Sequence, residues 1–344
     1  MPAGIAIGGN ILVDHIKQIG VFPSEGMLSP ILSESHALGG CVSNTAISLK
    51  RLDPGLRVAA SACVGADEWG RYALAQYAEA GIDTRGIHTL PDVPTGYTDV
   101  FSTASTRTFF VNNSSNDRYS LEYIDFDALD VRMLHMGYLL LLGHMDSPDE
   151  AFGTQMARSL WEAKRRGIYT SIDAVSENSD RFCHIIPAAL PYCNAVIFNE
   201  IEASRTTGIP VRAADEALLW DNLPALCEAL LDFGVEDVVV IHSPEMGIWM
   251  DTRREWICVR SLALPQGFIQ GSVGAGDAYC AAVLHGIYHK MEPVDILRLA
   301  NCAAAGCLSR QDANSGVGTV REMLRLGEAY AVQDDLWKGS ESSL

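Results

Sequence analysis

The sequence predicts an α/β fold in which helices cover both faces of one mostly parallel sheet. Short β-rich apolar runs alternate with longer helical patterns along most of the chain, and this alternation is typical of parallel βαβ units. The expected strands are residues 5–7, 58–64, 139–142, 169–172, 195–198 and 238–241. The expected helices are residues 43–52, 71–80, 153–166, 215–233 and 276–289. Functional groups in such a fold gather in the loops at the carboxyl ends of the strands.

Two stretches interrupt this alternation. Residues 15–36 are extended and rich in turn formers, and residues 96–112 alternate in the order Tyr97, Asp99, Phe101 and then Arg107, Phe109, Val111. Both predict antiparallel strands outside the main sheet, either as a small lid or as two edge hairpins without a special role. We therefore expect a single α/β domain over residues 1–330, with lid strands from about 15–36 and 96–112, and a polar tail over residues 331–344.

The charge of the chain argues against a nucleic-acid partner. Its 344 residues include 25 Lys and Arg against 43 Asp and Glu, which gives a net charge of −18. Nucleic-acid binding needs clustered cations to contact the phosphates. A nucleotide remains compatible, because backbone N–H groups and a metal ion can bind its phosphates.

Cysteine usage and hydropathy predict a cytoplasmic protein with no membrane partner. The nine cysteines are scattered and form no C-x-x-C pair, which indicates reduced thiols rather than disulfides or a zinc framework. The first residues lack the basic and apolar regions of a signal peptide. The longest apolar stretch, residues 133–145, is too short to span a bilayer and predicts a buried strand with its flanks.

The most informative motif is the glycine-rich segment of residues 271–277, Gly-Ser-Val-Gly-Ala-Gly-Asp, which leads into a run of small residues. A glycine turn before a helix leaves the first backbone N–H groups unpaired, and with the helix dipole they can bind anionic oxygens. Asp277 follows directly, where a carboxylate can act as acid or base beside a bound phosphoryl group. The alternative is a tight turn in which Asp277 only caps the helix.

Two further motifs offer groups that could bind a sugar. Residues 9–14, Gly-Asn-Ile-Leu-Val-Asp, place Asp14 just past the first strand, where a carboxylate can accept two hydroxyls or cap a turn. The pair Gly39-Gly40 then leads into a helix that contains Asn44. The glycines allow a ligand to approach the backbone, and the Asn44 amide is both donor and acceptor. A tight turn capped by Asn44 is the alternative.

Two other patterns suggest metal ligands less strongly. Asn199 and Glu202 follow a strand, where an N-x-x-E pattern can orient water on Mg²⁺. Helix capping also explains the pattern and is the favoured interpretation. His285 and His289 lie four residues apart on one expected helix. Because the sequence suggests no third ligand for them, we interpret them as core or surface histidines.

Taken in order, the motifs resemble those of the ribokinase, or PfkB, family of carbohydrate kinases over nearly the whole chain. The segments that carry the resemblance are residues 9–14, 39–44, 64–70, 80–84, 199–202 and 274–277. The resemblance implies a ribokinase-like three-layer α/β/α sandwich. It also implies a β-lid that closes over the sugar and often pairs two subunits, so a homodimer through the lid is expected.

The resemblance implies a role for each motif in an ATP-dependent sugar kinase. Asp277 would take a proton from the sugar hydroxyl, while the amides of Gly274, Ala275 and Gly276 would hold the transferring phosphoryl oxygens. The residues that would bind the sugar are Asp14, Gly39, Gly40 and Asn44. Asn199 and Glu202 would organise the Mg²⁺ that accompanies ATP. The residues that would contact the nucleotide are Gly247 and Asn301.

The chain also departs from the family pattern. Gly271 and Ser272 stand where similar chains have an acidic residue and a threonine near a monovalent-cation loop, which puts K⁺ activation in doubt. Of a Thr-x-Gly-x-x-Gly pattern only Gly247 is kept, and Val42 replaces a small residue. Residues 173–177, Asp-Ala-Val-Ser-Glu, lack the Asn and Arg of a D-x-N-x-R stretch, so a sugar acid is not the expected substrate.

Two alternatives to a sugar kinase remain. The stretch that begins at Asp173 faintly resembles pseudouridine kinases, and aromatic lid residues could stack on a base, so the acceptor could be a nucleoside. The second alternative is a catalytically silent sugar-binding protein of the same fold. The intact segment from Gly274 to Asp277 argues against it, because a sensor needs no base beside an anion site.

Overall fold

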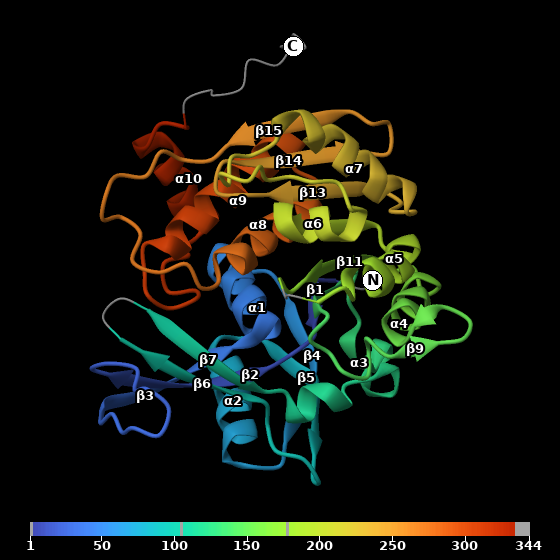
Figure 1. Cartoon of the computed structure of the whole chain (residues 1–344). Helices are drawn as coiled ribbons and strands as arrows, with labels where there is room; N and C mark the ends of the chain where they lie inside the picture. The colour runs from blue at the N-terminus through green and yellow to red at the C-terminus, as the bar shows by residue number, and fades with distance from the viewer. Residues whose placement is uncertain (1–2, 104–105, 177–178, 334–344) are drawn as a thin grey trace.

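The computed structural model describes residues 3–103, 106–176 and 179–333, and most of the expected tail at 331–344 lies outside these ranges. A nine-stranded sheet forms its centre, in the order β15-β14-β13-β12-β11-β8-β1-β4-β5 (Figure 1). Its strands are β1 (Ile5–Gly8), β4 (Val58–Gly65), β5 (Asp83–Leu90), β8 (Met133–Leu139), β11 (Tyr169–Ala174), β12 (Ala195–Asn199), β13 (Val238–His242), β14 (Met246–Asp251) and β15 (Trp256–Arg260). Seven are parallel, and only β14 and β15 are antiparallel to their neighbours.

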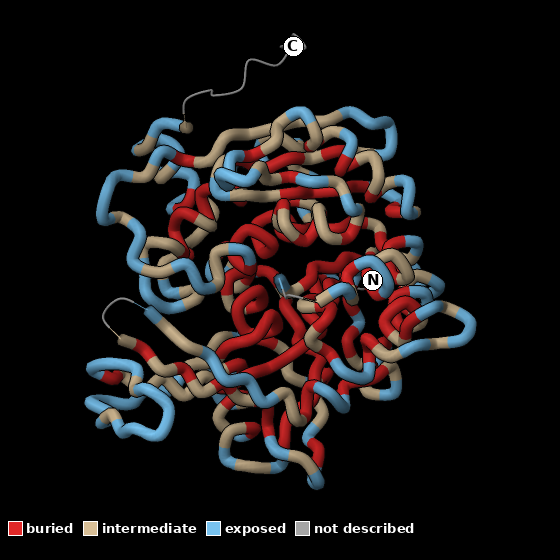
Figure 2. The backbone as a smooth tube through the Cα atoms, viewed as in Figure 1, coloured by how far each residue is buried: buried red, intermediate tan, exposed pale blue. Residues whose placement is uncertain are grey.

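Helices cover both faces of this sheet. They are α1 (Gly40–Leu52), α2 (Glu68–Glu79), α3 (Phe126–Leu129), α4 (Gln155–Lys164), α5 (Phe182–Ala189), α6 (Glu200–Thr207), α7 (Leu223–Asp232), α8 (Ala275–His289), α9 (Pro293–Leu308) and α10 (Val320–Ala329). Successive side chains of β13 enter two separate hydrophobic cores: Val239 and Ile241 pack with α4, α5 and α7, and Val238 and Val240 pack with α1, α8 and α9. Because successive strand side chains point to opposite faces of the sheet, the central strands contribute to both cores. Figure 2 shows the residues of these strands as buried. The predicted α/β sandwich is confirmed.

A separate four-stranded sheet projects from the main body and forms the predicted lid (Figure 1). Its order is β3 (Ile31–Gly39), β2 (Leu12–Ile19), β6 (Tyr97–Ser102) and β7 (Arg107–Asn112). The two hairpins are antiparallel within themselves, as expected, but β2 and β6 pair in parallel. That join between distant hairpins has no local signal in the sequence.

Two expected elements are shifted. The strand expected at 139–142 is β8, which ends at Leu139, because Tyr138 (φ 57°) and Leu140 (φ 79°) turn the backbone into a left-handed conformation. The helix expected at 215–233 begins only at Leu223, where Pro224 occupies the first turn without needing an N–H acceptor. The remaining short elements are β9 (Pro148–Asp149), β10 (Gly153–Thr154) and the 3₁₀ turns Ser114–Arg118, Leu121–Tyr123, Leu190–Tyr192 and Trp220–Asn222.

Candidate active site

Asp277 lies where α1, β8 and α8 meet. The residue is 5% exposed and lies in the first turn of α8. The Asn44 amide Nδ2, from the first turns of α1, donates to Asp277 Oδ2 at 3.0 Å. The Tyr138 hydroxyl, at the end of β8, donates to the same oxygen at 3.0 Å. Two residues that lie 233 and 139 positions from Asp277 in the chain therefore both bind its Oδ2.

The surroundings adjust the acidity of Asp277. Burial raises the pKa of Asp277 to about 7, and the nearby charge of Asp173 raises it further, whereas the hydrogen bonds from Asn44 and Tyr138 lower it. A carboxyl with a pKa near neutrality is suited to accept and return a proton at physiological pH. Such a perturbed acid in an enclosed site is a candidate functional group.

The backbone of the turn before Asp277 packs closely against the backbone of a neighbouring loop. Gly274 has φ 81°, and a Cβ there would lie 2.3 Å from the carbonyl oxygen of Ala313. The first intrahelical bond of α8 runs from the Ala278 N–H to the Gly274 carbonyl oxygen at 2.8 Å. The N–H groups of Gly276 and Asp277 therefore precede the first bonded position and have no acceptor within the helix. They are oriented as donors for an anion at the helix start.

Asp14 and the glycine pair lie together at the base of the lid. Asp14 is on β2, and a Cβ on Gly39 would lie 2.6 Å from its Oδ2. Gly40 has φ 83°, and a Cβ there would lie 2.6 Å from the carbonyl oxygen of Asn10. Burial raises the pKa of Asp14 to about 6, against a hydrogen bond from Thr98 that lowers it. The structure thus brings together the acid and the glycines that the sequence places about 25 residues apart.

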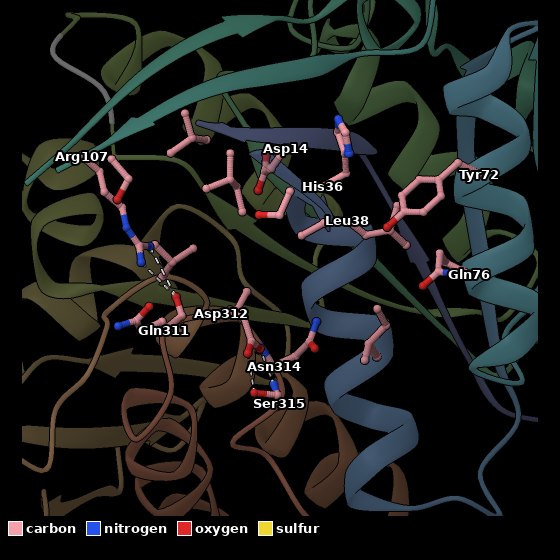
Figure 3. Close-up of a pocket in the computed structure, with 18 of the residues that line it drawn as sticks. Asp14, His36, Leu38, Tyr72, Gln76, Arg107, Gln311, Asp312, Asn314 and Ser315 are labelled. Carbon is pink, nitrogen blue, oxygen red and sulfur yellow. Dashed lines mark hydrogen bonds between the residues drawn. The ribbon is translucent and has the colours of Figure 1, made fainter. Parts of the chain in front are cut away.

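Asp14 also lines a large cavity under the lid. This cavity has a volume of about 730 Å³ and is bounded by the lid strands, by α1 and α2, and by the loop of residues 311–315 (Figure 3). The Arg107 guanidinium of β7 donates to the Gln311 carbonyl oxygen at 3.4 Å, which connects the lid to that loop. His36 and Tyr72 place aromatic rings on the wall of the cavity.

A buried network behind Asp277 was not anticipated from the sequence. The Tyr138 N–H donates to Asp173 Oδ1 at 2.5 Å, and His135 Nε2 lies 3.2 Å from Asp173 Oδ2. Tyr138 therefore binds Asp173 through its backbone and Asp277 through its hydroxyl. His135 in an otherwise apolar run was the available signal, but only tertiary structure shows that β8 and β11 bring it to Asp173.

Asn199 and Glu202 form a closed capping box at the start of α6. Asn199 Oδ1 accepts from the Glu202 N–H at 2.8 Å, and Glu202 Oε2 accepts from the Asn199 N–H at 3.0 Å. The Ser176 hydroxyl and the Asn199 amide both donate to Glu202 Oε1, at 3.0 and 2.8 Å. Burial, helped by the charge of Asp173, raises the pKa of Glu202 to about 8. The capping interpretation thus accounts for the whole N-x-x-E pattern.

The two expected nucleotide contacts have structural partners of their own. Gly247 is on β14, and a Cβ there would lie 2.0 Å from the Tyr279 hydroxyl, so packing alone requires glycine. The Asn301 amide of α9 donates to the carbonyl oxygens of Val259 and Arg260, at 3.3 and 3.0 Å, and joins α9 to β15.

No helix in the described residues is both long and apolar enough to cross a membrane.

Comparison with known proteins identifies the family. The model of the pfkB family of carbohydrate kinases matches residues 10–319. A ribokinase from Haemophilus influenzae is 23% identical over 335 residues, covering 95% of this chain and 99% of its own length. The structure of Arabidopsis thaliana ribokinase complexed with ribose and ATP superposes with a TM-score of 0.76 at 18% identity, covering 95% and 99% of the two chains. A protein assigned as a ribokinase II from E. coli, in complex with ATP and Mg²⁺, superposes with a TM-score of 0.74 at 19% identity, covering 95% and 99%. The expected fold and family are confirmed, and the chain belongs to the pfkB family of carbohydrate kinases, which transfer a phosphoryl group to an alcohol.

Proposed function

We propose that this chain phosphorylates a hydroxyl of a small sugar with ATP, and that Asp277 is the general base. The observation that carries the proposal is the Asp277 carboxyl itself, buried at the amino end of α8 with a pKa raised to about 7. The H. influenzae relative is a ribokinase, and the A. thaliana structure contains ribose and ATP, which favours a sugar and ATP here as well.

The hydrogen bonds to Asp277 indicate which oxygen acts. The bonds from Asn44 and Tyr138 both end on Oδ2, so Oδ1 is the proton acceptor in our proposal. As the sugar oxygen bonds to the γ-phosphorus, its proton passes to Oδ1 and the bond to the ADP oxygen breaks. The N–H groups from Gly274 to Asp277 hold the transferring oxygens, where they stabilise the charge of the transition state.

The sugar would lie between Asp14 and Asp277. Asp14 accepts hydroxyl donors, Gly39 and Gly40 leave room for the ring, and the unpaired Asn44 Oδ1 accepts a further hydroxyl. Because these groups lie at the starts of α1 and α8 and on lid strand β2, they would orient the acceptor hydroxyl toward Asp277 Oδ1. Such positioning contributes a large part of the catalysis of phosphoryl transfer.

The residues around Asp173 fit a divalent cation. The pKa values of both Glu202 and Asp277 are raised by burial and by the charge of Asp173, and a cation would relieve that repulsion. When bound with ATP, Mg²⁺ neutralises charge on the phosphates. Asn199 and Glu202 would hold its water shell through lone pairs that the capping box leaves free, and Gly247 and Asn301 would lie near the nucleotide.

The lid surface supports a homodimer. Large apolar side chains are exposed on the β2–β3 hairpin and on β7, with Leu28 88%, Met27 72% and Phe110 53% exposed. Covering them with the lid of a second copy would remove apolar surface from water.

All nine cysteines are free thiols, which fits the reducing cytoplasm proposed for the protein.

A nucleoside is the second candidate acceptor. His36 and Tyr72 line the cavity, and their neighbour Trp69 packs against both, with ring centroids 4.7 and 6.1 Å away. These rings could stack on a base.

A coupled assay of ADP release over matched panels of sugars and nucleosides tests both candidates. Turnover of a free sugar that is lost in Asp277→Asn supports the proposal. Turnover of nucleosides alone would replace it with the second candidate. ATP-dependent turnover of neither class would contradict both.

A further inference from the structure

A second cluster of ligand-type side chains lies at the opposite ends of the helices that form the active site. Asp53 follows the last residue of α1, and His285 and His289 are in the last two turns of α8. We propose that Asp53, His285 and His289 bind a divalent transition-metal ion such as Zn²⁺, which fastens α1 to α8. This proposal is independent of the sugar-kinase reaction.

The distances within the cluster suit a small metal ion. Asp53 Oδ2 lies 3.2 Å from His289 Nε2 and 3.7 Å from His285 Nε2, and the two imidazole centroids are 4.4 Å apart. All three ligand atoms lie within 4.8 Å of one another. Zinc bonds of about 2.0–2.1 Å in a tetrahedron place neighbouring ligand atoms roughly 3.4 Å apart. The two separations between the carboxylate and the histidines are therefore close to those of zinc ligands, and the third is within 4.8 Å.

The Asp53 carboxylate is held in a suitable orientation. Its Oδ1 accepts from the N–H groups of Gly55 and Leu56, at 2.9 and 3.2 Å, which leaves Oδ2 directed at the two imidazoles. Supporting bonds of this kind fix a ligand before the metal arrives. The carboxyl ends of α1 and α8 also carry partial negative charge, which favours a cation at this place.

The cluster is accessible to a metal ion from solvent. His285 is buried, whereas the side chains of His289 and Asp53 are 41% and 27% exposed, so one side of the cluster is open to solvent for entry and for a water ligand. Since His285 Nδ1 is buried without a partner among the described residues, we expect moderate rather than tight affinity.

The position of the cluster predicts an effect on stability. The amino end of α1 contributes Gly40 and Asn44, the amino end of α8 contributes Gly274 and Asp277, and the two helices pack against each other. An ion at their carboxyl ends would bind the folded state and not the unfolded chain, so it would raise the melting temperature.

Thermal unfolding of metal-free protein with and without ZnCl₂ tests the proposal, together with calorimetric titration. We expect one ion per chain and a rise in Tm on the order of 2–5 °C at a hundredfold excess over Kd. Asp53→Asn keeps an oxygen for the Gly55 and Leu56 bonds but removes the anionic ligand, and His289→Ala removes a side chain that is 41% exposed. Both variants should lose the rise, whereas His144→Ala, an exposed histidine elsewhere, should keep it.

Three results would overturn the proposal. These are no Tm rise and no binding heat in the unchanged protein, a rise that persists in both cluster variants, or a rise equally lost in His144→Ala. A Co²⁺ titration adds a spectroscopic readout, because Co²⁺ in a four-coordinate site absorbs visible light strongly. That absorption should be absent in Asp53→Asn.

Discussion

The two sides of the candidate site use their polar groups differently. The acceptor side comprises Asp14, Gly39, Gly40, Asn44 and Asp277. The nucleotide side comprises Asn199, Glu202, Gly247 and Asn301. On the acceptor side, Asn44 Oδ1 is buried with no partner among the described residues, and both bonds to Asp277 end on one oxygen. On the nucleotide side, Asn199, Glu202 and Asn301 are already hydrogen-bonded within the protein.

This difference separates two kinds of motif residue. A buried polar group that the fold leaves unpaired is costly without a ligand, whereas one with all its partners is explained by the fold alone. We therefore expect substitutions of Asp14, Asn44 and Asp277 to impair catalysis with little loss of stability, whereas Gly39 and Gly40 leave no room for a Cβ. Substitutions on the nucleotide side should reduce stability first.

Asp277→Asn should have the largest effect. The amide keeps the size of the side chain but cannot accept the proton, and loss of general-base catalysis typically lowers the rate about 10²–10⁴-fold. Steady-state kinetics measure the loss, while Tm and calorimetric sugar binding serve as controls and should change little. A variant that retains more than about a tenth of the wild-type rate would remove Asp277 from this role.

Asp14→Ala should raise the KM for the sugar far more than that for ATP. Loss of the carboxylate leaves sugar hydroxyls unpaired in a closed site, which is worth about 1–3 kcal/mol, or roughly 5–150-fold. The measurement is the pair of KM values in one preparation. Equal changes for both substrates, or none for either, would indicate that Asp14 only supports the base of the lid.

Tyr138→Phe should shift the pH dependence of the reaction. Since Asp277 must be ionised to accept a proton, kcat/KM should fall as pH decreases through about 7. The Tyr138 hydroxyl stabilises the carboxylate and lowers its pKa, so its removal should raise that pKa and move the acidic limb to higher pH. One such bond is worth about 1 kcal/mol, which predicts a loss of up to roughly fivefold below neutrality.

Tyr192→Phe, which alters a tyrosine packed against Phe152 far from Asp277 in the fold, is the matched control. Its pH profile should not move. If the Tyr138→Phe profile coincides with that of the control, the Tyr138 hydroxyl does not act on Asp277.

The sequence predicted local features well and tertiary encounters poorly. The apolar runs predicted most of the central strands, and the glycine-rich turn predicted the start of α8, where Asp277 lies, because both signals are contained in a few neighbouring residues. His135 and Gly137 obscured the start of β8, although His135 is buried and bonded to Ser171 and Asp173. Tyr138 and Asp53 could not be assigned, since each meets its partners only after distant elements pack. The spacing of His285 and His289 was visible in the sequence, but they were interpreted as core or surface histidines, because Asp53 at the end of α1 meets them only in the fold.

Asn199→Ala tests whether the nucleotide side does more than support the fold. Loss of this N-cap should lower the free energy of unfolding by about 1 kcal/mol. Thr319→Ala is a matched control, because Thr319 and Glu322 form the same capping box on α10. Both variants should lose similar stability in denaturant titrations, and only Asn199→Ala should raise the Mg²⁺ concentration needed for half-maximal activity. Equal Mg²⁺ requirements would reduce Asn199 to a helix cap.

Exchange of K⁺ should have the smallest effect. Gly271 offers no carboxylate, and a Cβ there would lie 2.9 Å from the Arg310 carbonyl oxygen, so no side chain fits. The Cys307 thiol already donates to the carbonyl oxygens of Val273 and Ala313, at 3.3 and 3.1 Å, in the glycine-rich segment and in the loop of residues 311–315 beside it. Rates in Mg²⁺ should therefore change little when K⁺ is replaced by tetramethylammonium at constant ionic strength. Strong stimulation by K⁺ would show that these carbonyl oxygens bind a cation in preference to the thiol. The turn before Asp277 would then be completed by an ion, unlike the nucleotide side, whose polar groups are paired within the protein.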